Sequence, residues 1–322
     1  MIELREVSKS FGGALAVDNL SLRIEGGAFF VLIGPSGCGK STVLRMINAM
    51  ISCDRGKIEI GGQDIAKLDP VTLRRGIGYV IQSGGLFPHW TIKDNIAAVP
   101  RLLGWSDARC AERLDEIVAM LRIDPALLPR YPRQLSGGQQ QRIGVARALA
   151  ADPDVILMDE PFAALDPVSR ADLQEELRRL HAQSCKTIVF VTHDMDEALR
   201  LATHMAVMNK GALVQTGAPA EIMLRPADQF VRAFLGGDNL PLRLLEFTPV
   251  QDRLRSGSKL GRIFGQGVGA GAGETIAASA SLKAALTLML ARGCDHLDVE
   301  DESGARLGEI HAADIIAGDD AR

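Results

Sequence analysis

The chain has 322 residues, of which 47% are hydrophobic and 24% are charged. This composition is typical of a folded globular protein with room for one large domain and one small one. The 36 basic and 40 acidic residues give a formal net charge of −4, which excludes a strong overall field that would attract nucleic acid.

The sequence has no run of about 18 apolar residues and no signal-peptide pattern at its start. We therefore expect a cytoplasmic chain that reaches a membrane only through a partner. The five cysteines are scattered without the spacing of a metal site, which predicts reduced thiols at Cys38, Cys53, Cys110, Cys185 and Cys294.

Residues 2–62 alternate apolar and polar positions in short runs separated by glycine turns, for instance at 17–22 and 56–62. This alternation predicts an antiparallel layer of half-buried strands. The run 29–33 is apolar throughout, which predicts a buried strand joined to that layer.

A glycine-rich stretch follows this strand and fits the phosphate-loop pattern of glycine, four residues, glycine, lysine and then serine or threonine. It consists of Gly34, Pro35, Ser36, Gly37, Cys38, Gly39, Lys40, Ser41 and Thr42. Helical periodicity begins directly after it. In this setting the glycines would turn backbone N–H groups toward phosphate oxygens, and the helix N-terminus would add its partial positive charge.

The loop therefore predicts a site for a nucleoside triphosphate such as ATP. Lys40 would reach the β- and γ-phosphates as a compact cation, and the Ser41 hydroxyl would ligate Mg²⁺. The alternative is a glycine-rich turn between a strand and a helix that binds no ligand.

Helical periodicity continues from about residue 88 to 150, for example at Leu114, Ile117, Val118 and Leu121. Within this segment Ser136 is a good N-cap for the helix that follows it, and the two glycines after Ser136 leave backbone N–H groups open to an anion. Taken alone, this pattern is only that of a capped helix.

The apolar runs at 155–158 and 187–191 predict two buried parallel strands, and strands that alternate with helices predict a doubly wound α/β core. Asp159 and Glu160 follow the first run, at the end of a strand where open α/β sheets bind ligands. Asp159 would hold Mg²⁺, and Glu160 would polarise the water that attacks the γ-phosphate. The alternative is an acidic pair that caps a helix.

The phosphate loop, the Asp159–Glu160 pair and the Leu-Ser-Gly-Gly-Gln segment together resemble the ATPase subunit of ABC transporters, over residues 1–235. The resemblance implies a P-loop ATPase fold with an antiparallel β layer and a helical subdomain at about 88–150. In this family two chains stack head to tail, and a signature segment of one chain closes over the nucleotide bound at Lys40 of the other. That segment contains Ser136, Gly137, Gly138 and Gln139 here.

The same resemblance assigns roles to four single residues. Phe11 matches the aromatic residue that stacks on adenine, and Gln82 matches the glutamine that senses Mg²⁺ and the γ-phosphate. Asp166 matches the loop that crosses the dimer interface, and His193 matches the switch histidine at the γ-phosphate. Phe11 could instead be a core residue, and His193 could cap a helix.

The stretch after Gln82 resembles the osmoprotectant importers of this family, which take up glycine betaine, choline or related quaternary amines. Leu86, Phe87, Pro88 and Trp90 are large apolar residues in a loop-like stretch, which is typical of an anchored contact with a membrane partner. They could also pack beneath the helical subdomain. The runs 134–170 and 187–199 resemble the same subgroup, with Ala163 where glycine is usual.

The C-terminal part begins with a linker predicted at 236–275, which is rich in glycine from residue 251 to 273. A helix and two strands predicted over 276–318 resemble a single CBS repeat. Such repeats normally come in pairs, so either residues 251–275 form a degenerate first half or two chains pair their single repeats. The linker also carries a local positive charge, which is either simply solvated or a weak contact with anionic lipid.

The resemblance thus implies an ATP-hydrolysing subunit of an importer for a quaternary-amine osmoprotectant at the cytoplasmic face of the inner membrane. It would work as a homodimer with permease subunits and, through them, an extracytoplasmic solute-binding protein. Its metal ligands would be Ser41, Gln82 and Asp159. The alternatives are an importer of another small solute, such as an amino acid, and a soluble ABC ATPase that acts on nucleic acid or ribosomes.

Overall fold

The computed structural model describes residues 1–82, 85–163, 165–254 and 274–316. The chain divides into two compact units, Met1–Val231 and Arg232–Arg322. Within the described ranges, no helix is both long enough and apolar enough to span a bilayer.

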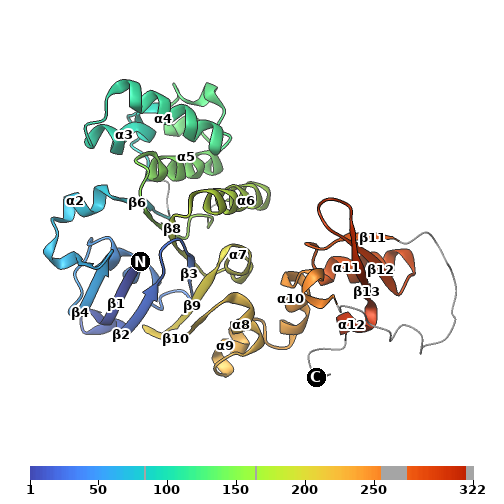
Figure 1. Cartoon of the computed structure of the whole chain (residues 1–322). Coiled ribbons are helices and arrows are strands. Elements are labelled where there is room, and N and C mark those ends of the chain that lie inside the picture. The colour runs from blue at the N-terminus through green and yellow to red at the C-terminus, as the bar shows by residue number, and fades with distance from the viewer. Residues whose placement is uncertain (83–84, 164, 255–273, 317–322) are drawn as a thin grey trace. The chain divides into compact units, whose positions relative to one another are not determined.

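The first unit contains a four-stranded antiparallel sheet in the order β2-β1-β4-β5 (Figure 1). One face of β1 is apolar at every second residue near its start, and this face buries Ile2 and Leu4 in the same cluster as Leu44. The antiparallel layer predicted for this part of the chain is confirmed. Its strands are β1 (Ile2–Phe11), β2 (Ala14–Ile24), β4 (Arg55–Ile60) and β5 (Gln63–Asp64).

A six-stranded sheet in the order β10-β9-β3-β8-β7-β6 forms the centre of this unit. All neighbouring strands are parallel except β9 and β10, so the carboxyl ends of β3, β7 and β8 lie at one edge. Every residue of β3, β7 and β8 is buried, as their continuous apolar runs predict. The strands are β3 (Phe29–Ile33), β6 (Ile77–Val80), β7 (Val155–Asp159), β8 (Thr187–Thr192), β9 (His204–Asn209) and β10 (Ala212–Gly217).

Two groups of helices accompany these sheets. The core helices are α1 (Lys40–Ile47), α2 (Pro70–Arg75), α6 (Pro167–Ser184), α7 (Met195–Leu201), α8 (Pro219–Leu224) and α9 (Gln229–Phe234), with a 3-10 turn at Ile65–Lys67. A separate helical layer packs α3 (Ile92–Leu102), α4 (Asp107–Met120) and α5 (Gly137–Ala150) together, with 3-10 turns at Pro125–Leu127 and Pro132–Gln134. Figure 1 shows this layer grouped at one end of the first unit, as the family resemblance implies.

Polar side chains begin the helices of this layer at defined residues. Thr91, Ser106 and Ser136 each accept a hydrogen bond from the backbone N–H three residues on. Such N-caps satisfy backbone donors that would otherwise have no partner inside the helix.

The second unit has a three-stranded sheet in the order β11-β12-β13, in which β11 and β12 are parallel and β12 and β13 antiparallel. Its hydrophobic cluster contains Leu297 and Ile310 from the sheet and Ala285 and Met289 from α11. The elements are α10 (Leu240–Phe247), β11 (Thr275–Ala277), α11 (Leu282–Arg292), β12 (His296–Glu300), β13 (Arg306–His311) and α12 (Ala312–Ile316). The likeness to a CBS repeat stays a prediction.

The structure differs from the expectation for the first half of the linker at 236–275. Residues 240–247 form helix α10, and 3-10 turns occur at Gly237–Asn239 and Val250–Arg253. The Val250 backbone N–H donates to Ala280 O at 2.8 Å. The Val250 side chain is fully buried in the hydrophobic cluster of the second unit. This apolar anchor folds the segment, whereas the glycine-rich stretch from 255 to 273 lies outside the described residues.

Candidate nucleotide-binding site

The phosphate loop joins buried strand β3 to helix α1, as the sequence predicts. Gly39, the last residue before the helix, has φ +108°, and a Cβ there would lie 2.4 Å from Ala16 O. Only glycine fits both the backbone conformation and the close approach. The loop is therefore packed against strand β2 in a shape that a side chain at this position would disturb.

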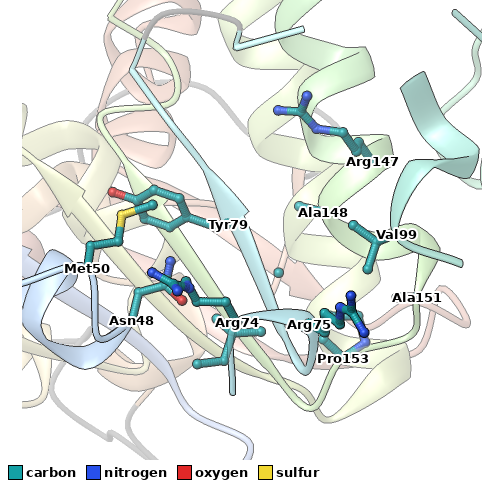
Figure 2. Close-up of a pocket in the computed structure, with 12 residues that line it drawn as sticks. Asn48, Met50, Arg74, Arg75, Tyr79, Val99, Arg147, Ala148, Ala151 and Pro153 are labelled. Carbon is teal, nitrogen blue, oxygen red and sulfur yellow. The ribbon is translucent and has the colours of Figure 1, made fainter. Parts of the chain in front are cut away.

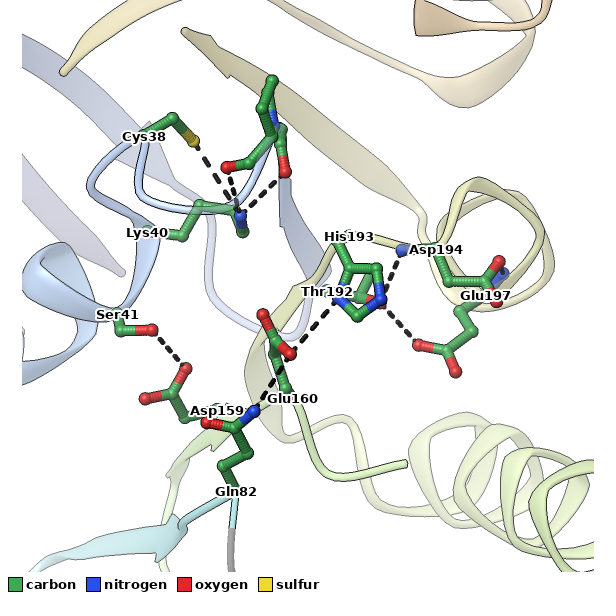
Figure 3. Close-up of polar contacts among 12 residues, drawn as sticks. Cys38, Lys40, Ser41, Gln82, Asp159, Glu160, Thr192, His193, Asp194 and Glu197 are labelled. Carbon is green, nitrogen blue, oxygen red and sulfur yellow. Dashed lines mark hydrogen bonds and ion pairs between the residues drawn. The ribbon is translucent and has the colours of Figure 1, made fainter. Parts of the chain in front are cut away.

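Lys40 is 4% exposed, and its ammonium group lies inside the loop. Lys40 Nζ donates to Gly34 O at 2.7 Å and to Pro35 O at 3.0 Å, and it lies 3.8 Å from Cys38 Sγ (Figure 3). Burial raises the pKa of the Cys38 thiol, so this neighbour stays uncharged. Among the described residues, the cation thus has carbonyl partners but no carboxylate partner, which suits a site for an anion.

Ser41 and Asp159 lie together although they are 118 positions apart, because helix α1 begins beside the end of β7. The Ser41 hydroxyl donates to Asp159 Oδ1 at 2.7 Å. Asp159 is 5% exposed, and this burial raises the pKa of its carboxyl group, although the bond from Ser41 opposes the shift. A hydroxyl and a buried carboxylate are hard oxygen ligands, and a divalent cation beside them would favour the ionised carboxylate, so the two residues fit Mg²⁺.

Glu160 directly follows β7 and contacts two other predicted catalytic residues, Gln82 and His193. Its Oε2 accepts a hydrogen bond from Gln82 Nε2 at 3.3 Å and lies 3.2 Å from His193 Nδ1. Figure 3 shows the carboxylate between these two side chains, which arrive from the ends of β6 and β8. Glu160 adopts φ +43°, and its backbone N–H donates to Val191 O, so the strained turn is tied to the neighbouring strand.

Sequence reasoning missed the residues that hold the segment around His193. The Thr192 hydroxyl donates to Glu197 Oε2 at 2.6 Å and accepts from the backbone N–H of Asp194 at 3.0 Å. Asp194 caps helix α7, and burial raises the pKa of Glu197. An Asp followed three residues later by a Glu is a typical helix start, so the sequence did contain a signal for the Asp194 cap.

The signature residues form a capping box that lies apart from this group. Ser136 Oγ accepts from the Gln139 backbone N–H, and the Gln139 side chain accepts from the Ser136 backbone N–H. A Cβ on Gly138 would approach Ser169 of α6, so the Gly138 backbone lies beside that helix. No hydrogen bond within the described part of the chain joins the signature segment to Lys40, Glu160 or His193.

The two remaining predicted residues, Asp166 and Phe11, lie at the start of a helix and at the end of a strand. Asp166 caps α6 by accepting from the backbone N–H groups of Val168 and Ser169, and its bonds to Ser169 hold its pKa below the usual value. Phe11 ends β1 with 51% of its surface exposed, and Lys9 Nζ lies 5.5 Å from its ring. The interpretation of Phe11 as a plain core residue is therefore wrong.

A second candidate surface lies near the residues that follow Gln82. Phe87 and Trp90 are 42% and 37% exposed, so they are not simply packed beneath the helical layer. A cavity of about 210 Å³ is lined by Asn48 and by residues of α2, β6, α3 and α5. Three of these residues are arginines, Arg74 and Arg75 from α2 and Arg147 from α5 (Figure 2). Asn48 is 2% exposed, and among the described residues its Oδ1 has no hydrogen-bond partner.

A phosphate loop between a buried strand and a helix, with two carboxylates at the end of a parallel strand in the same sheet, defines the class of P-loop nucleoside triphosphatases. A family model described as ABC transporter matches residues 17–163. The chain belongs to the ABC transporter ATP-binding family.

The relatives and solved structures that resemble this chain agree with that assignment. The glycine betaine uptake system ATP-binding protein YehX of Escherichia coli is 50% identical over 98% of this chain and 99% of its own length. The glycine betaine/carnitine/choline transport ATP-binding protein OpuCA of Bacillus subtilis is 46% identical over 96% of this chain and 78% of its own. A dimeric post-hydrolysis structure of the ATP-binding cassette MJ0796, bound to ADP and Pi, covers 68% of this chain and 99% of that one, with a TM-score of 0.63 and 32% identity.

The buried carboxylate gives a prediction for Asp159→Asn. Because burial raises the folded-state pKa of Asp159 above its unfolded value, the stability it contributes is present below the unfolded pKa and is lost as pH rises through the folded pKa. We therefore expect the nucleotide-free variant to melt higher than wild type at about pH 7.5, by roughly 2–4 °C for each kcal/mol relieved, with the gap narrowing in acid.

Differential scanning calorimetry across pH measures this effect, with Asp154→Asn as the matched control at an exposed position. Mg²⁺ with ATP should stabilise wild type more than Asp159→Asn. A variant that melts lower than wild type at about pH 7.5 would show that the ionised carboxylate is favourable in the folded chain.

Proposed function

We propose that this chain is the ATP-hydrolysing subunit of an ABC importer that takes up a quaternary-amine osmoprotectant. The observation that carries the ATPase part is the Glu160 carboxylate held between Gln82 and His193 beside Lys40, Ser41 and Asp159. The relatives named for glycine betaine, choline and carnitine uptake, which align along nearly the whole chain, support the substrate class.

In the proposed reaction the phosphate loop binds ATP first. The loop N–H groups and the N-terminus of α1 attract the phosphates, and Lys40 exchanges its carbonyl partners for the β- and γ-phosphate oxygens. Ser41 and Asp159, with Gln82, would hold Mg²⁺, which when bound neutralises charge that develops on the phosphates. Phe11, exposed at the end of β1, is suited to stack on the adenine.

Glu160 would then orient the attacking water and accept its proton. Gln82 and His193 keep the carboxylate in one orientation, because both contact the same oxygen. Thr192, Asp194 and Glu197 fix the backbone on either side of His193, so the histidine is held at a defined position beside Glu160, from which it would contact the γ-phosphate.

We further propose that the site is completed by a second copy of this chain. Ser136, Gly137, Gly138 and Gln139 make no hydrogen bond to the phosphate-loop group of their own chain within the described residues, and their capped helix N-terminus is suited to an anion. The dimeric state of the similar MJ0796 cassette supports a head-to-tail pair in which Asp166 lies near the interface.

The permease is the expected membrane partner, and through it an extracytoplasmic solute-binding protein. Phe87 and Trp90 offer exposed aromatic anchors, and the adjacent cavity offers Arg74 and Arg75. These groups suit a partner segment that carries apolar side chains and inserts an acidic side chain. Such contacts would place the subunit at the cytoplasmic face of the membrane.

Two experiments test the proposal as a whole. Isolation of the tagged chain from detergent-solubilised membranes should recover an integral-membrane permease. A strain that lacks this subunit should lose uptake of labelled betaine, choline or carnitine and regain it with the wild-type gene. Recovery of ribosomes or nucleic acid without a permease would favour the soluble ABC ATPase, and loss of amino-acid uptake alone would favour the other importer class.

Glu160→Gln is expected to keep ATP binding but to slow hydrolysis by roughly 10²–10⁴-fold, because the amide cannot accept the proton from water. Steady-state phosphate release measures the rate, and size-exclusion chromatography with ATP should show a trapped dimer. Glu175→Gln on the exposed face of α6 is the matched control. Turnover close to wild type would move the base to another residue, with His193 the next candidate.

Lys40→Ala is expected to weaken nucleotide binding itself, since it removes a positive charge from the phosphates. Isothermal titration with a slowly hydrolysed ATP analogue measures the affinity, and Lys57→Ala on the antiparallel sheet serves as the control. An unchanged affinity for the analogue in Lys40→Ala would contradict the phosphate-loop assignment.

Phe87→Ala is expected to impair transport while the ATPase rate of the isolated subunit stays within about twofold, because within the described residues Phe87 interacts with Asn95, His89, Trp90 and Arg147 and with none of the predicted nucleotide residues. Loss of an interface anchor typically costs about 2 kcal/mol or more. Uptake by reconstituted transporter and ATPase of the free subunit are compared, with Leu224→Ala at another exposed apolar position as the control. Parallel loss of both activities would show that Phe87 is part of the core.

A further inference from the structure

The segment between Gln82 and α3 presents its aromatic side chains in one cluster. We call residues 85–91 the aromatic loop. The rings of Phe87 and Trp90 lie with their centroids 4.6 Å apart, and the His89 ring lies 6.4 Å and 6.2 Å from them. The Phe87 and Trp90 side chains are large, apolar and substantially exposed, so they need support from the backbone to keep one arrangement.

Asn95, in the first turns of α3, provides most of that support. Its side chain is 0% exposed. Its Oδ1 accepts from the Phe87 backbone N–H at 2.7 Å, and its Nδ2 lies 3.1 Å from Phe87 O, 3.2 Å from Trp90 O and 3.0 Å from Thr91 O. One buried amide therefore joins the backbone at both aromatic residues to the start of the helix.

Arg147 fastens the other end of the aromatic loop from a different helix. Its Nη1 donates to Gly85 O at 2.7 Å, and its guanidinium lies 5.8 Å from the centre of the Phe87 ring. Gly85 has φ +55°, and its neighbour Arg147 belongs to α5, the helix that begins after Ser136. Burial lowers the pKa of Arg147, so the guanidinium is held in a partly desolvated position.

The burial of Asn95 argues that the shape of the aromatic loop matters. Burying an amide raises the free energy of the folded state unless its hydrogen-bonding groups have partners, and both groups of Asn95 bond to backbone atoms of the aromatic loop. A partner that binds a loop already held in its bound shape loses less conformational entropy on binding. Neither residue contacts Lys40, Glu160 or His193 in any interaction within the described chain.

We infer that Asn95 and Arg147 are positioning residues that hold the aromatic loop in a preformed shape, so that Phe87 and Trp90 are ready to receive a membrane-embedded partner subunit. The docking part of this inference rests on the proposed function. The preformed shape itself is a property of the chain alone and is tested without the partner.

The full chain with Trp105→Phe retains Trp90 as its sole tryptophan, because the sequence contains two. Acrylamide quenching of Trp90 then reports how well the aromatic loop is ordered. Asn95→Asp replaces the amide donor by a carboxylate facing three carbonyl oxygens, and Arg147→Met removes the bond to Gly85. Each should raise the quenching constant by about twofold or more, because local opening exposes the indole.

Two controls separate positioning from general stability. Ile117→Ala creates a cavity at a fully buried position of α4 in the same helical layer, and it should lower the melting temperature with little change in Trp90 quenching. Arg147→Lys keeps a donor for Gly85 O and should restore most of the shielding. If Asn95→Asp does not fold, the Arg147→Met and Arg147→Lys pair alone decides the outcome, because Arg147 is only half-buried.

Unchanged quenching in both the Asn95→Asp and Arg147→Met chains would overturn the inference, as would an equal rise in Ile117→Ala. Transport by the reconstituted complex gives a separate readout. Raised quenching with a parallel loss of transport supports both the positioning role and the docking role. Raised quenching with full transport supports the positioning role and overturns the docking surface assigned to the aromatic loop.

Discussion

The parallel strands β3, β7 and β8 end at one edge of the six-stranded sheet, and the chemistry of one chain depends on that shared edge. β3 brings the phosphate loop with Lys40, β7 brings Asp159 and Glu160, and β8 brings the segment around His193. Groups that are more than a hundred residues apart come within hydrogen-bond distance because parallel strands align their carboxyl ends.

A chain arranged in this way holds only half of the proposed machinery. The signature segment caps α5 and, within the described residues, makes no hydrogen bond to the phosphate-loop group of its own chain, whereas the aromatic loop presents Phe87 and Trp90 at the surface. Asn95 links that loop to α3, and Arg147 links it to α5, the helix that also carries the signature segment at its beginning. The residues proposed for hydrolysis and the loop proposed for docking therefore belong to different elements of the same unit.

The sequence was sufficient for groups whose residues are adjacent along the chain. The phosphate loop, the Asp159–Glu160 pair and the buried strands follow from local spacing and from continuous apolar runs, and the structure has them there. Asn95, Arg147 and Glu197 could not be found in this way, because their roles depend on backbone groups that only the folded chain brings near. The composition of the segment at 240–254 gave no sign that Val250 would be anchored by Ala280.

If ATP is hydrolysed in a site that a second copy of this chain completes, as we propose, the specific ATPase activity of the full chain depends on protein concentration. Activity is measured at increasing protein concentration, with the molar mass followed by light scattering under the same conditions. We expect activity that rises with the fraction of nucleotide-bound dimer and reaches a plateau when dimerisation is complete. Full specific activity from a chain that remains monomeric at every concentration would contradict this proposal.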